Sequence, residues 1–343
     1  MVEEFIHAGH EVRVSDRPNA DYSMLAKLGV EIVPAELDDS QALARAVRGM
    51  DVVAHVAGIF DLSAPPELLE KVNHQGTRNM CEAVLQNAPN CQKFVHVSTV
   101  GVYGQPKNCP CRETDPKLPR NAYEISKLRG EEAAFEFFEK SGLPVTALRP
   151  TLIYGPRSRY GLALFVSLLS LRKQNGASTM HNVVSGPKGS HIHIEDMARA
   201  VRLVSQASAS TGKAYNVAGP TPLAAPEMVR SLALALGYEV KDIVPFYTWV
   251  MESFQWLFEH TPPRFFNWID SRLAKRWKEI CREHHLTADL CPRFEPHWII
   301  YLMQDCYFDT SELAGLGMEW KYPDPAKGLM DTIAWYKENR WIP

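Results

Sequence analysis

The sequence has no long hydrophobic run and no feature of a secretory leader. Its longest apolar stretch, residues 161–171, is interrupted by Ser167 and Ser170 and is too short to cross a bilayer as a helix. The first four residues include Glu3 and Glu4, and no apolar core follows them, so no signal peptide is expected. These absences favour a globular protein over a membrane-spanning or secreted one.

The sequence also lacks a large excess of charge of one sign and cysteine pairs with the spacing of a metal site. The 37 basic and 40 acidic residues leave a formal net charge of −3, so no overall attraction to nucleic acid or acidic membranes is expected. The expected partner is a small-molecule substrate. The seven cysteines are odd in number and lack zinc-ligand spacing, and Cys109-Pro110-Cys111 has no second pair to complete a metal site. His181, His191 and His193 likewise lack a complete ligand set. We therefore expect reduced thiols, a cytoplasmic location and no metal.

What is present is an alternation of short apolar strands with helical patterns. Strands are expected at residues 11–15, 30–33, 51–57, 93–98 and 145–149, with helices near residues 22–28, 40–48, 67–86 and 119–140 between them. Such alternation predicts an α/β fold with a doubly wound parallel sheet, and the apolar strands fit a sheet covered on both faces.

One helix carries a tyrosine and a lysine four residues apart. Tyr123 and Lys127 should share a face, one turn from each other. An ammonium near a phenol favours the phenolate and lowers its pKa from about 10. A tyrosine tuned in this way can exchange a proton with an alcohol or ketone oxygen. The alternative, a surface tyrosine with a helical neighbour, remains open on this spacing alone.

Residues at the ends of the predicted strands suit a dinucleotide. Asp16 ends the second expected strand, where a carboxylate binds an adenosine ribose and repels a 2′-phosphate, which favours NAD over NADP. A turn-forming Asp before Arg17-Pro18 is the alternative. Further strand ends supply Glu36 with Leu37, then Val56, Ala57 and Gly58, and finally Thr99. A doubly wound sheet normally opens with a strand and a glycine-rich turn, which do not precede Val2. We expect either a start further upstream or a protein that has lost the loop.

Taken in order, these segments resemble the extended short-chain dehydrogenases/reductases, the nicotinamide-dependent group that includes nucleotide-sugar epimerases, dehydratases and hydroxysteroid dehydrogenases. The motifs that carry the resemblance are Gly9-His10-Glu11-Val12, Asp16, Glu36-Leu37, His55-Val56-Ala57-Gly58, Asn73-His74-Gln75-Gly76-Thr77, Val97-Ser98-Thr99, Tyr123 with Lys127, Arg149-Pro150-Thr151-Leu152-Ile153-Tyr154-Gly155-Pro156, His193-Ile194-Glu195-Asp196 and Tyr215-Asn216-Val217. The segment from Cys306 to the end is similar to the hydroxysteroid-dehydrogenase-like branch.

The resemblance implies roles for individual residues. Tyr123 would be the general acid/base, Lys127 would contact the nicotinamide ribose and lower the tyrosine pKa, and Thr99 would bind the substrate oxygen. Pro150 and Ile153 would line the nicotinamide pocket. Ser98 and Asn73 would belong to the cofactor site, although helix packing is an equally good role for Asn73. The resemblance also implies a homodimer formed through the long helices.

The predicted organisation is a Rossmann-like NAD-binding domain at residues 1–155 and a smaller, mainly helical substrate-binding cap at residues 156–343, with residues 191–218 returning to the main sheet. Residues 246–258 are rich in aromatics, and residues 264–282 carry six basic side chains. This region, 246–282, is expected either to cap an apolar substrate or to lie on a membrane surface. A plain aromatic core element followed by a solvated helix is the alternative.

Three functional hypotheses follow. The first is an NAD-dependent oxidoreductase that interconverts a secondary alcohol and a ketone on a bulky, apolar, sterol- or isoprenoid-like substrate. The second is a nucleotide-sugar epimerase or dehydratase that uses bound NAD, for which Arg157, Arg159, Arg172 and Lys173 would hold a diphosphate. The third is a truncated, catalytically silent member.

Overall fold

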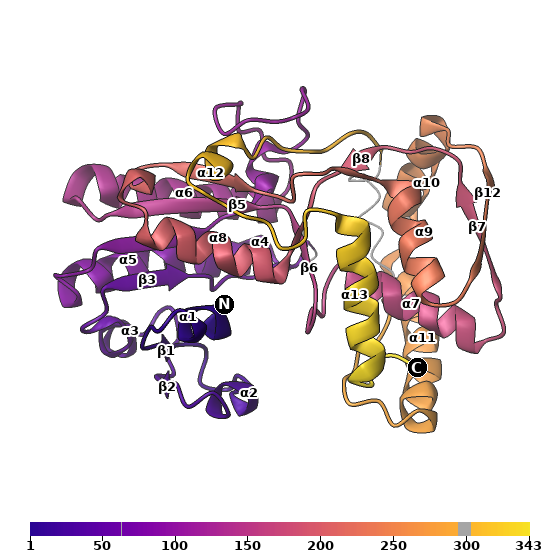
Figure 1. The fold of residues 1–343 in the computed structure, drawn as a ribbon, viewed down its shortest axis with the longest axis horizontal. Coiled ribbons are helices and arrows are strands. Elements are labelled where there is room, and N and C mark those ends of the chain that lie inside the picture. The colour runs from indigo at the N-terminus through magenta and orange to yellow at the C-terminus, as the bar shows by residue number, and fades with distance from the viewer. Residues whose placement is uncertain (63, 294–302) are drawn as a thin grey trace. The chain divides into compact units, whose positions relative to one another are not determined.

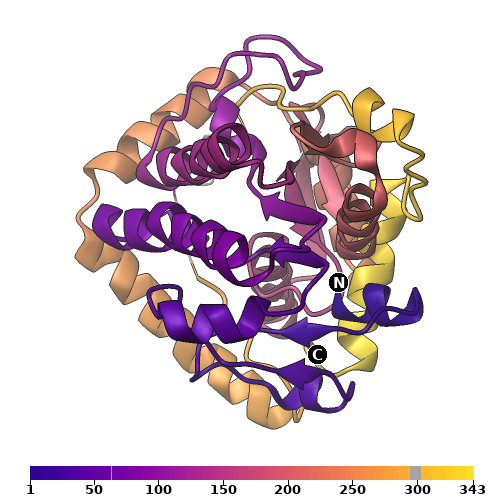
Figure 2. The ribbon, with the colours of Figure 1, turned by 90° about the vertical axis from the view of Figure 1, so that its left-hand side faces the viewer.

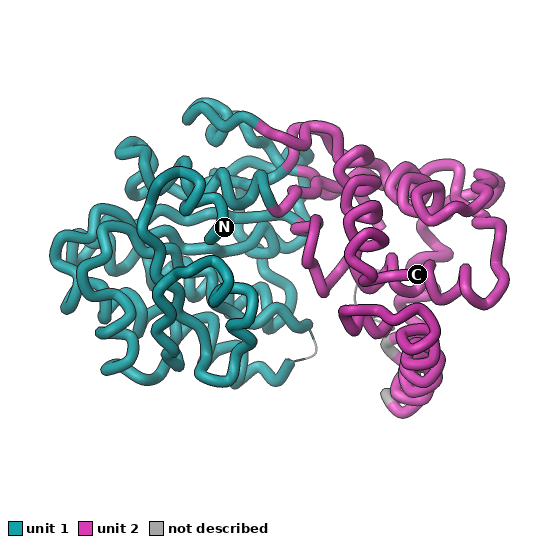
Figure 3. The backbone as a smooth tube through the Cα atoms, turned by 60° about the horizontal axis from the view of Figure 1, so that its bottom comes forward, with its two compact units in different colours: residues 1–151, 195–218, 308–319 teal, residues 152–194, 219–307, 320–343 magenta. Residues whose placement is uncertain are grey.

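The chain folds into two compact units, each built from separate stretches of sequence. The computed structural model describes residues 1–62, 64–293 and 303–343. The first unit comprises Met1–Thr151, Glu195–Ala218 and Phe308–Glu319, and the second comprises Leu152–Ile194, Gly219–Tyr307 and Trp320–Pro343 (Figure 3). The division therefore falls at Thr151 instead of residue 155, and later segments of the chain return to the first unit.

A parallel four-stranded sheet forms the centre of the first unit. Its strands are ordered β10-β5-β4-β3, with bounds Ala214–Val217, Val145–Pro150, Lys93–Val97 and Val52–His55. Every neighbouring pair is parallel. Strands β1 (Arg13–Val14) and β2 (Glu31–Ile32) form a separate parallel pair. All five residues of β4 and all six of β5 are buried, as expected for strands covered on both faces.

Helices cover both faces of this sheet. Figure 2 shows α5 (Gly76–Asn87) and α6 (Ala122–Ser141) on one side and α8 (Ile194–Gln206) on the other. The remaining helices of the unit are α1 (Val2–His7), α2 (Ser23–Ala26), α3 (Ser40–Val47), α4 (Pro66–Leu69), α12 (Ser311–Gly315) and the 3₁₀ turns Val100–Tyr103 and Ser208–Ser210. The predicted doubly wound, Rossmann-like fold is confirmed.

A buried ion pair ties α6 to β5. Arg149 donates two hydrogen bonds to Glu131, of 3.0 Å from Nε and 2.6 Å from Nη2, and Lys117 adds a 2.8 Å contact to the same carboxylate. Arg149 also donates to the Tyr103 hydroxyl, which bonds Asn216 of β10. Because Glu131 and Arg149 are almost fully buried, each charge needs the other to offset the free-energy cost of its burial.

The late segment Phe308–Glu319 is fastened to the first unit. Phe308 pairs with Cys111 in a β-bridge, and the backbone N–H of Asp309 donates to the Cys111 carbonyl at 2.8 Å. The Asn216 amide donates to the carbonyl oxygens of both Cys111 and Asp309. The segment is therefore held by backbone pairing and by a buried side chain of β10.

The second unit is mainly helical. Figure 1 labels its helices, which are α7 (Leu162–Gln174), α9 (Ala225–Ala235), α10 (Thr248–His260), α11 (Pro263–Glu283) and α13 (Pro325–Glu338). Three two-stranded sheets join them: β6 (Leu152–Tyr154) with β9 (His191–His193), β7 (Thr179–Val183) with β12 (Glu239–Val244), and β8 (Lys188–Gly189) with β11 (Leu223–Ala224). Trp277, Ile280, Leu232 and Tyr336 are fully buried members of its core. No described helix is long and apolar enough to cross a membrane.

Two sequence-based expectations need correction. Residues 67–86 do not form one regular helix, because a π-helix, η1 (Glu70–Gln75), separates α4 from α5. Of residues 191–218, expected to return to the main sheet, residues 195–218 belong to the first unit and β10 pairs in its sheet. Residues 191–193, however, form β9, which pairs with β6 in the second unit.

Candidate active site

Helix α6 places Tyr123 and Lys127 on one buried face. The helix begins where the Asn121 side chain accepts a 2.9 Å hydrogen bond from the Glu124 backbone N–H, and it ends at Gly142, whose φ of 71° suits glycine. Tyr123 is 9% exposed and Lys127 is 5% exposed. The capped start therefore fixes both side chains within the first two turns.

Thr99 meets Tyr123 from the end of β4. Its hydroxyl accepts a 3.1 Å hydrogen bond from the Gly101 N–H and lies close enough to the Tyr123 hydroxyl to influence its acidity. Burial raises the pKa of Tyr123 well above its ordinary value, and the nearby Thr99 hydroxyl opposes this only in part. The expectation that Lys127 lowers this pKa is therefore wrong for this structure, because the cost of burying a phenolate outweighs the favourable contacts.

Lys127 directs its ammonium toward the carboxyl end of β4. Its Nζ donates a 2.6 Å hydrogen bond to the Val97 carbonyl. Burial lowers the pKa of Lys127 to about 8, opposed by the charge of Glu131. Gly58 lies nearby, and a Cβ at that position would be 3.7 Å from Lys127 Nζ and 3.0 Å from Asn73 Oδ1. The absence of a side chain at Gly58 therefore leaves room beside the ammonium.

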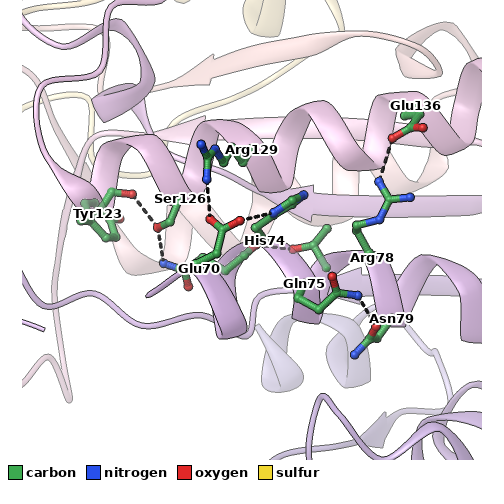
Figure 4. Close-up of polar contacts among 11 residues, drawn as sticks. Glu70, His74, Gln75, Arg78, Asn79, Tyr123, Ser126, Arg129 and Glu136 are labelled. Carbon is green, nitrogen blue, oxygen red and sulfur yellow. Dashed lines mark hydrogen bonds and ion pairs between the residues drawn. The ribbon is translucent and has the colours of Figure 1, made fainter. Parts of the chain in front are cut away.

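Asn73 joins three parts of this site. Its amide accepts from the Ile59 N–H at 2.8 Å and donates to the Ile59 carbonyl at 3.1 Å and to the Ser126 hydroxyl at 3.0 Å. Ser126 in turn donates to the Tyr123 carbonyl at 2.8 Å (Figure 4). Asn73 thus links the loop after β3 to the helix that carries Tyr123. Ser126 was missed from sequence, although it stands three residues after Tyr123 in the same helix.

The π-helix that contains Asn73 packs tightly on α6. A Cβ at Gly130 would lie 2.4 Å from the Asn73 carbonyl oxygen, which instead accepts a 2.8 Å hydrogen bond from the Thr77 hydroxyl. The Glu70 carboxylate lies between His74, at 2.7 Å, and Arg129 of α6, at 3.1 Å (Figure 4). Only a glycine in α6 allows this approach, and the irregular winding turns Asn73 toward the site.

Two buried histidines lie near Lys127, and neither was predicted from the sequence to belong to the site. His55 of β3 and His96 of β4 are register partners with ring centroids 5.8 Å apart. Burial, and next the charge of Lys127, lower the pKa of both, that of His55 to about 3. His55 bonds Thr77, whereas neither ring nitrogen of His96 has a described partner, nor does the nearby Ser98 hydroxyl. Both rings are therefore neutral at physiological pH.

The predicted cofactor residues lie in different places. Asp16 is exposed after β1, where its carboxylate accepts a 2.7 Å hydrogen bond from the Arg17 N–H. Val56, Ala57 and Gly58 are all exposed after β3. Glu36 is exposed, but Leu37 packs against Gly76, and its carbonyl accepts from Asn79. The exposed carboxylate, the open strip after β3 and the unpartnered Ser98 hydroxyl fit a dinucleotide laid across the strand ends.

Two predicted pocket residues fall in different units. Pro150 is buried in β5 of the first unit and pairs with Val217. Ile153 belongs to β6 of the second unit and pairs with Ile192. The described residues contain no cluster of three or more metal-ligating side chains.

Comparison with known proteins gives relatives of several activities. The chain is 24% identical over 225 residues to UDP-glucose 4-epimerase of Vibrio cholerae, covering 64% of this chain and 65% of the relative. It is 33% identical over 161 residues to human 3 beta-hydroxysteroid dehydrogenase type 7, covering 42% and 43%. For the first two curated relatives the match spans about half of their length, 48% and 52%.

Solved structures share the whole fold. A dTDP-glucose 4,6-dehydratase double mutant from Streptomyces venezuelae, crystallised with NAD bound, superposes with a TM-score of 0.70 at 21% identity, covering 99% of this chain and 93% of the other. A putative epimerase from Burkholderia cenocepacia gives 0.69 at 19% identity, covering 97% and 91%. The model of the NAD dependent epimerase/dehydratase family matches residues 1–218. The chain belongs to this family, the NAD-dependent epimerases and dehydratases.

Proposed function

We propose that the chain is an NAD-dependent oxidoreductase that interconverts a secondary alcohol and a ketone on a bulky, apolar, sterol- or isoprenoid-like substrate. The observation that carries the proposal is the proximity of the Tyr123 and Thr99 hydroxyls, with a buried ammonium one helical turn away. The 33% identity to human 3 beta-hydroxysteroid dehydrogenase type 7 supports the substrate class.

Thr99 and Tyr123 would have different roles at the substrate oxygen. Thr99 would hold that oxygen by a hydrogen bond, and Tyr123 would exchange the proton. Because its pKa is raised, Tyr123 is a neutral phenol and is set to donate a proton to a ketone oxygen. In the other direction the phenol must first lose its proton, and the nearby Thr99 hydroxyl is the group that favours this loss. Bound NAD would accept the hydride from the alcohol carbon, and bound NADH would supply it to the ketone carbon.

Asp16 supports NAD over NADP. Its exposed carboxylate follows β1, where it would accept hydrogen bonds from ribose hydroxyls and repel a 2′-phosphate. The hydrogen bond from the Arg17 N–H also satisfies the turn-forming role considered from sequence. Both roles are compatible, because one carboxylate accepts several hydrogen bonds.

A nucleotide-sugar epimerase or dehydratase is the second candidate, and the similarity to UDP-glucose 4-epimerase favours it. The basic side chains expected to bind a diphosphate give weaker support to this second candidate. Arg159 lies over the Trp341 ring at 5.0 Å, Arg172 contacts the Met180 sulfur at 3.4 Å, and Lys173 donates to the Gly237 carbonyl. Each of these side chains already contacts other residues of the second unit.

Substrate profiling separates the two candidates. The full chain would be incubated with NAD and either hydroxysterols or nucleotide sugars, while NADH absorbance is followed. An oxidoreductase accumulates NADH in proportion to ketone, whereas an epimerase converts a nucleotide sugar with no net NADH. Sugar turnover without sterol turnover would overturn the proposal.

We further propose that the chain forms a homodimer through exposed faces of α5 and α6. The two helices already pack side by side in one chain, joined by the 2.7 Å pair of Arg78 and Glu136 (Figure 4). Leu85 of α5 and Ile125 of α6 are exposed apolar side chains suited to such an interface. Analytical ultracentrifugation of the chain and of a Leu85→Glu variant tests it, and a monomeric parent chain would refute it.

A further inference from the structure

Helix α10 of the second unit leaves its large aromatic side chains in solvent. Trp249 is 63% exposed and Trp256 is 61% exposed, and Phe254 and Leu257 are exposed as well. None of the described side chains of α10 is buried. A helix on the surface of a globular protein normally buries one apolar stripe. Helix α10 is unusual because most of its large apolar side chains are exposed to solvent.

The same surface continues onto the start of α11. Phe265 and Trp268 are exposed and stack on each other at 6.1 Å. Phe258 of α10 meets Phe266 of α11 edge to face at 6.1 Å, which joins the two helices. Figures 1 and 2 show the pair as consecutive orange helices. Further along, α11 buries Trp277 and Ile280 in the core, which anchors the pair to its unit.

Basic side chains accompany the exposed aromatics. Arg264, Trp268, Arg272 and Lys275 share the outer face of α11, opposite the buried Trp277. The Arg272 guanidinium lies over the Trp268 ring at 4.5 Å. Arg276 is instead occupied by Glu279 and Glu283. Helix α11 carries six basic residues, at positions 264, 272, 275, 276, 278 and 282, against the acidic residues Asp270, Glu279 and Glu283.

We propose that α10 and the first turns of α11 bind the surface of an anionic lipid bilayer. Trp249, Trp256 and Trp268 would lie at the level of the headgroups, where tryptophan is favoured, and Arg272 and Lys275 would contact lipid phosphates. This inference does not depend on the proposed function, because it concerns a surface made only of residues 247–282.

The distribution of the apolar side chains favours a bilayer over a protein partner. Trp249 and Trp256 lie on one side of α10, about 100° from Leu257 and further from Phe254. A rigid protein surface would cover one of these sides, whereas the fluid headgroup layer adapts to side chains that point in several directions. A second copy of the chain is disfavoured, because it would oppose the exposed Arg272 and Lys275 with the same charges.

Vesicle flotation of the full chain tests the proposal. Binding is expected to phosphatidylcholine vesicles that contain phosphatidylserine, with at least about tenfold weaker binding to phosphatidylcholine alone. Trp249→Ala with Trp268→Ala, and separately Arg272→Glu with Lys275→Glu, should each weaken binding about tenfold or more. The matched controls, Ile243→Ala and Lys327→Glu, change an exposed apolar residue and an exposed cation elsewhere and should bind like the parent chain.

Several outcomes would overturn the inference. They are no binding to anionic vesicles, equal binding to both vesicle types, or an aromatic variant that only dissociates an oligomer in ultracentrifugation. Circular dichroism verifies that each variant is folded, and the charge-reversal pair provides a second test if the tryptophan pair is not. Flotation requires no turnover, so failure of this inference and failure of the proposed activity are distinguished.

Discussion

Lys127 donates a 2.6 Å hydrogen bond to the Val97 carbonyl, and this contact fastens the helix of Tyr123 to the carboxyl end of β4. The ammonium is buried beside two histidines that are neutral, so few groups near it stabilise its positive charge. Loss of the proton from this ammonium would therefore weaken the attachment of the helix to the strand.

The pH dependence of turnover should report Lys127. Burial lowers its pKa to about 8, against 10.5 for an ordinary lysine, so the ammonium is lost as the pH rises through about 8. We expect kcat to fall over that range in the full chain. In Lys127→Arg the fall should move to higher pH, because a guanidinium stays charged. Rates that stay constant to about pH 10 in the parent chain would contradict the prediction.

Removal of the Tyr123 hydroxyl should abolish most turnover. Tyr123→Phe takes away the proton donor, and we expect kcat to fall about 10²–10⁴-fold while NAD affinity stays within about twofold. The matched control is Tyr238→Phe, whose hydroxyl bonds the Leu169 carbonyl in the second unit and should affect stability only. Steady-state kinetics and NAD titration measure both, and near-normal turnover of Tyr123→Phe would refute the proton-transfer role.

Asp16→Ala should relax the preference for NAD. The change removes the carboxylate that would repel a 2′-phosphate and leaves Arg17 beside the site. The ratio of kcat/KM with NAD to that with NADP should fall about tenfold. Asp331→Ala, an exposed position on α13, is the control and should leave the ratio unchanged. An unchanged ratio in Asp16→Ala would rule out Asp16 as the selector.

Gly130→Ala should destabilise the first unit. The new Cβ would lie 2.4 Å from the Asn73 carbonyl oxygen, and backbone atoms on both sides must shift. We expect the free energy of unfolding to drop by about 1–3 kcal/mol in urea denaturation. Gly315→Ala in α12 meets no atom within 4 Å and should be neutral. Equal stability of the two variants would show that α6 and the π-helix separate easily.

Acid should weaken the pair formed by Glu131 and Arg149. Burial alone would raise the pKa of Glu131, but Arg149 and Lys117 outweigh it and lower the pKa to about 2, below the ordinary 4.5. The folded state therefore binds fewer protons, and the stabilisation present above about pH 4.5 is lost as the pH falls toward 2. Glu131→Gln should cost about 3–5 kcal/mol at neutral pH and reduce that slope. An unaltered slope in urea unfolding would assign acid sensitivity elsewhere.

Sequence patterns were sufficient for the parallel sheet and for the helix that carries Tyr123 and Lys127. Alternating apolar strands are local signals, and the tyrosine helix is fixed by its own spacing and caps. The π-helix was not predicted, and the contact of Asn73 in it with Gly130 joins residues far apart in sequence, which local patterns do not reveal. The raised pKa of Tyr123 was missed for a similar reason, since burial is set by tertiary packing that a spacing of four residues does not reveal.

The attachment of Phe308 to Cys111 has a consequence for biosynthesis. A ribosome releases the tyrosine, the lysine and most of the sheet well before residues 308–319, which complete their unit. A nascent chain stalled before residue 308 would carry Tyr123 and Lys127 on an unfinished scaffold. Stable folding of this half is therefore expected only once residues 308–319 have emerged, and circular permutation, more than simple truncation, is the route to an autonomous version of it.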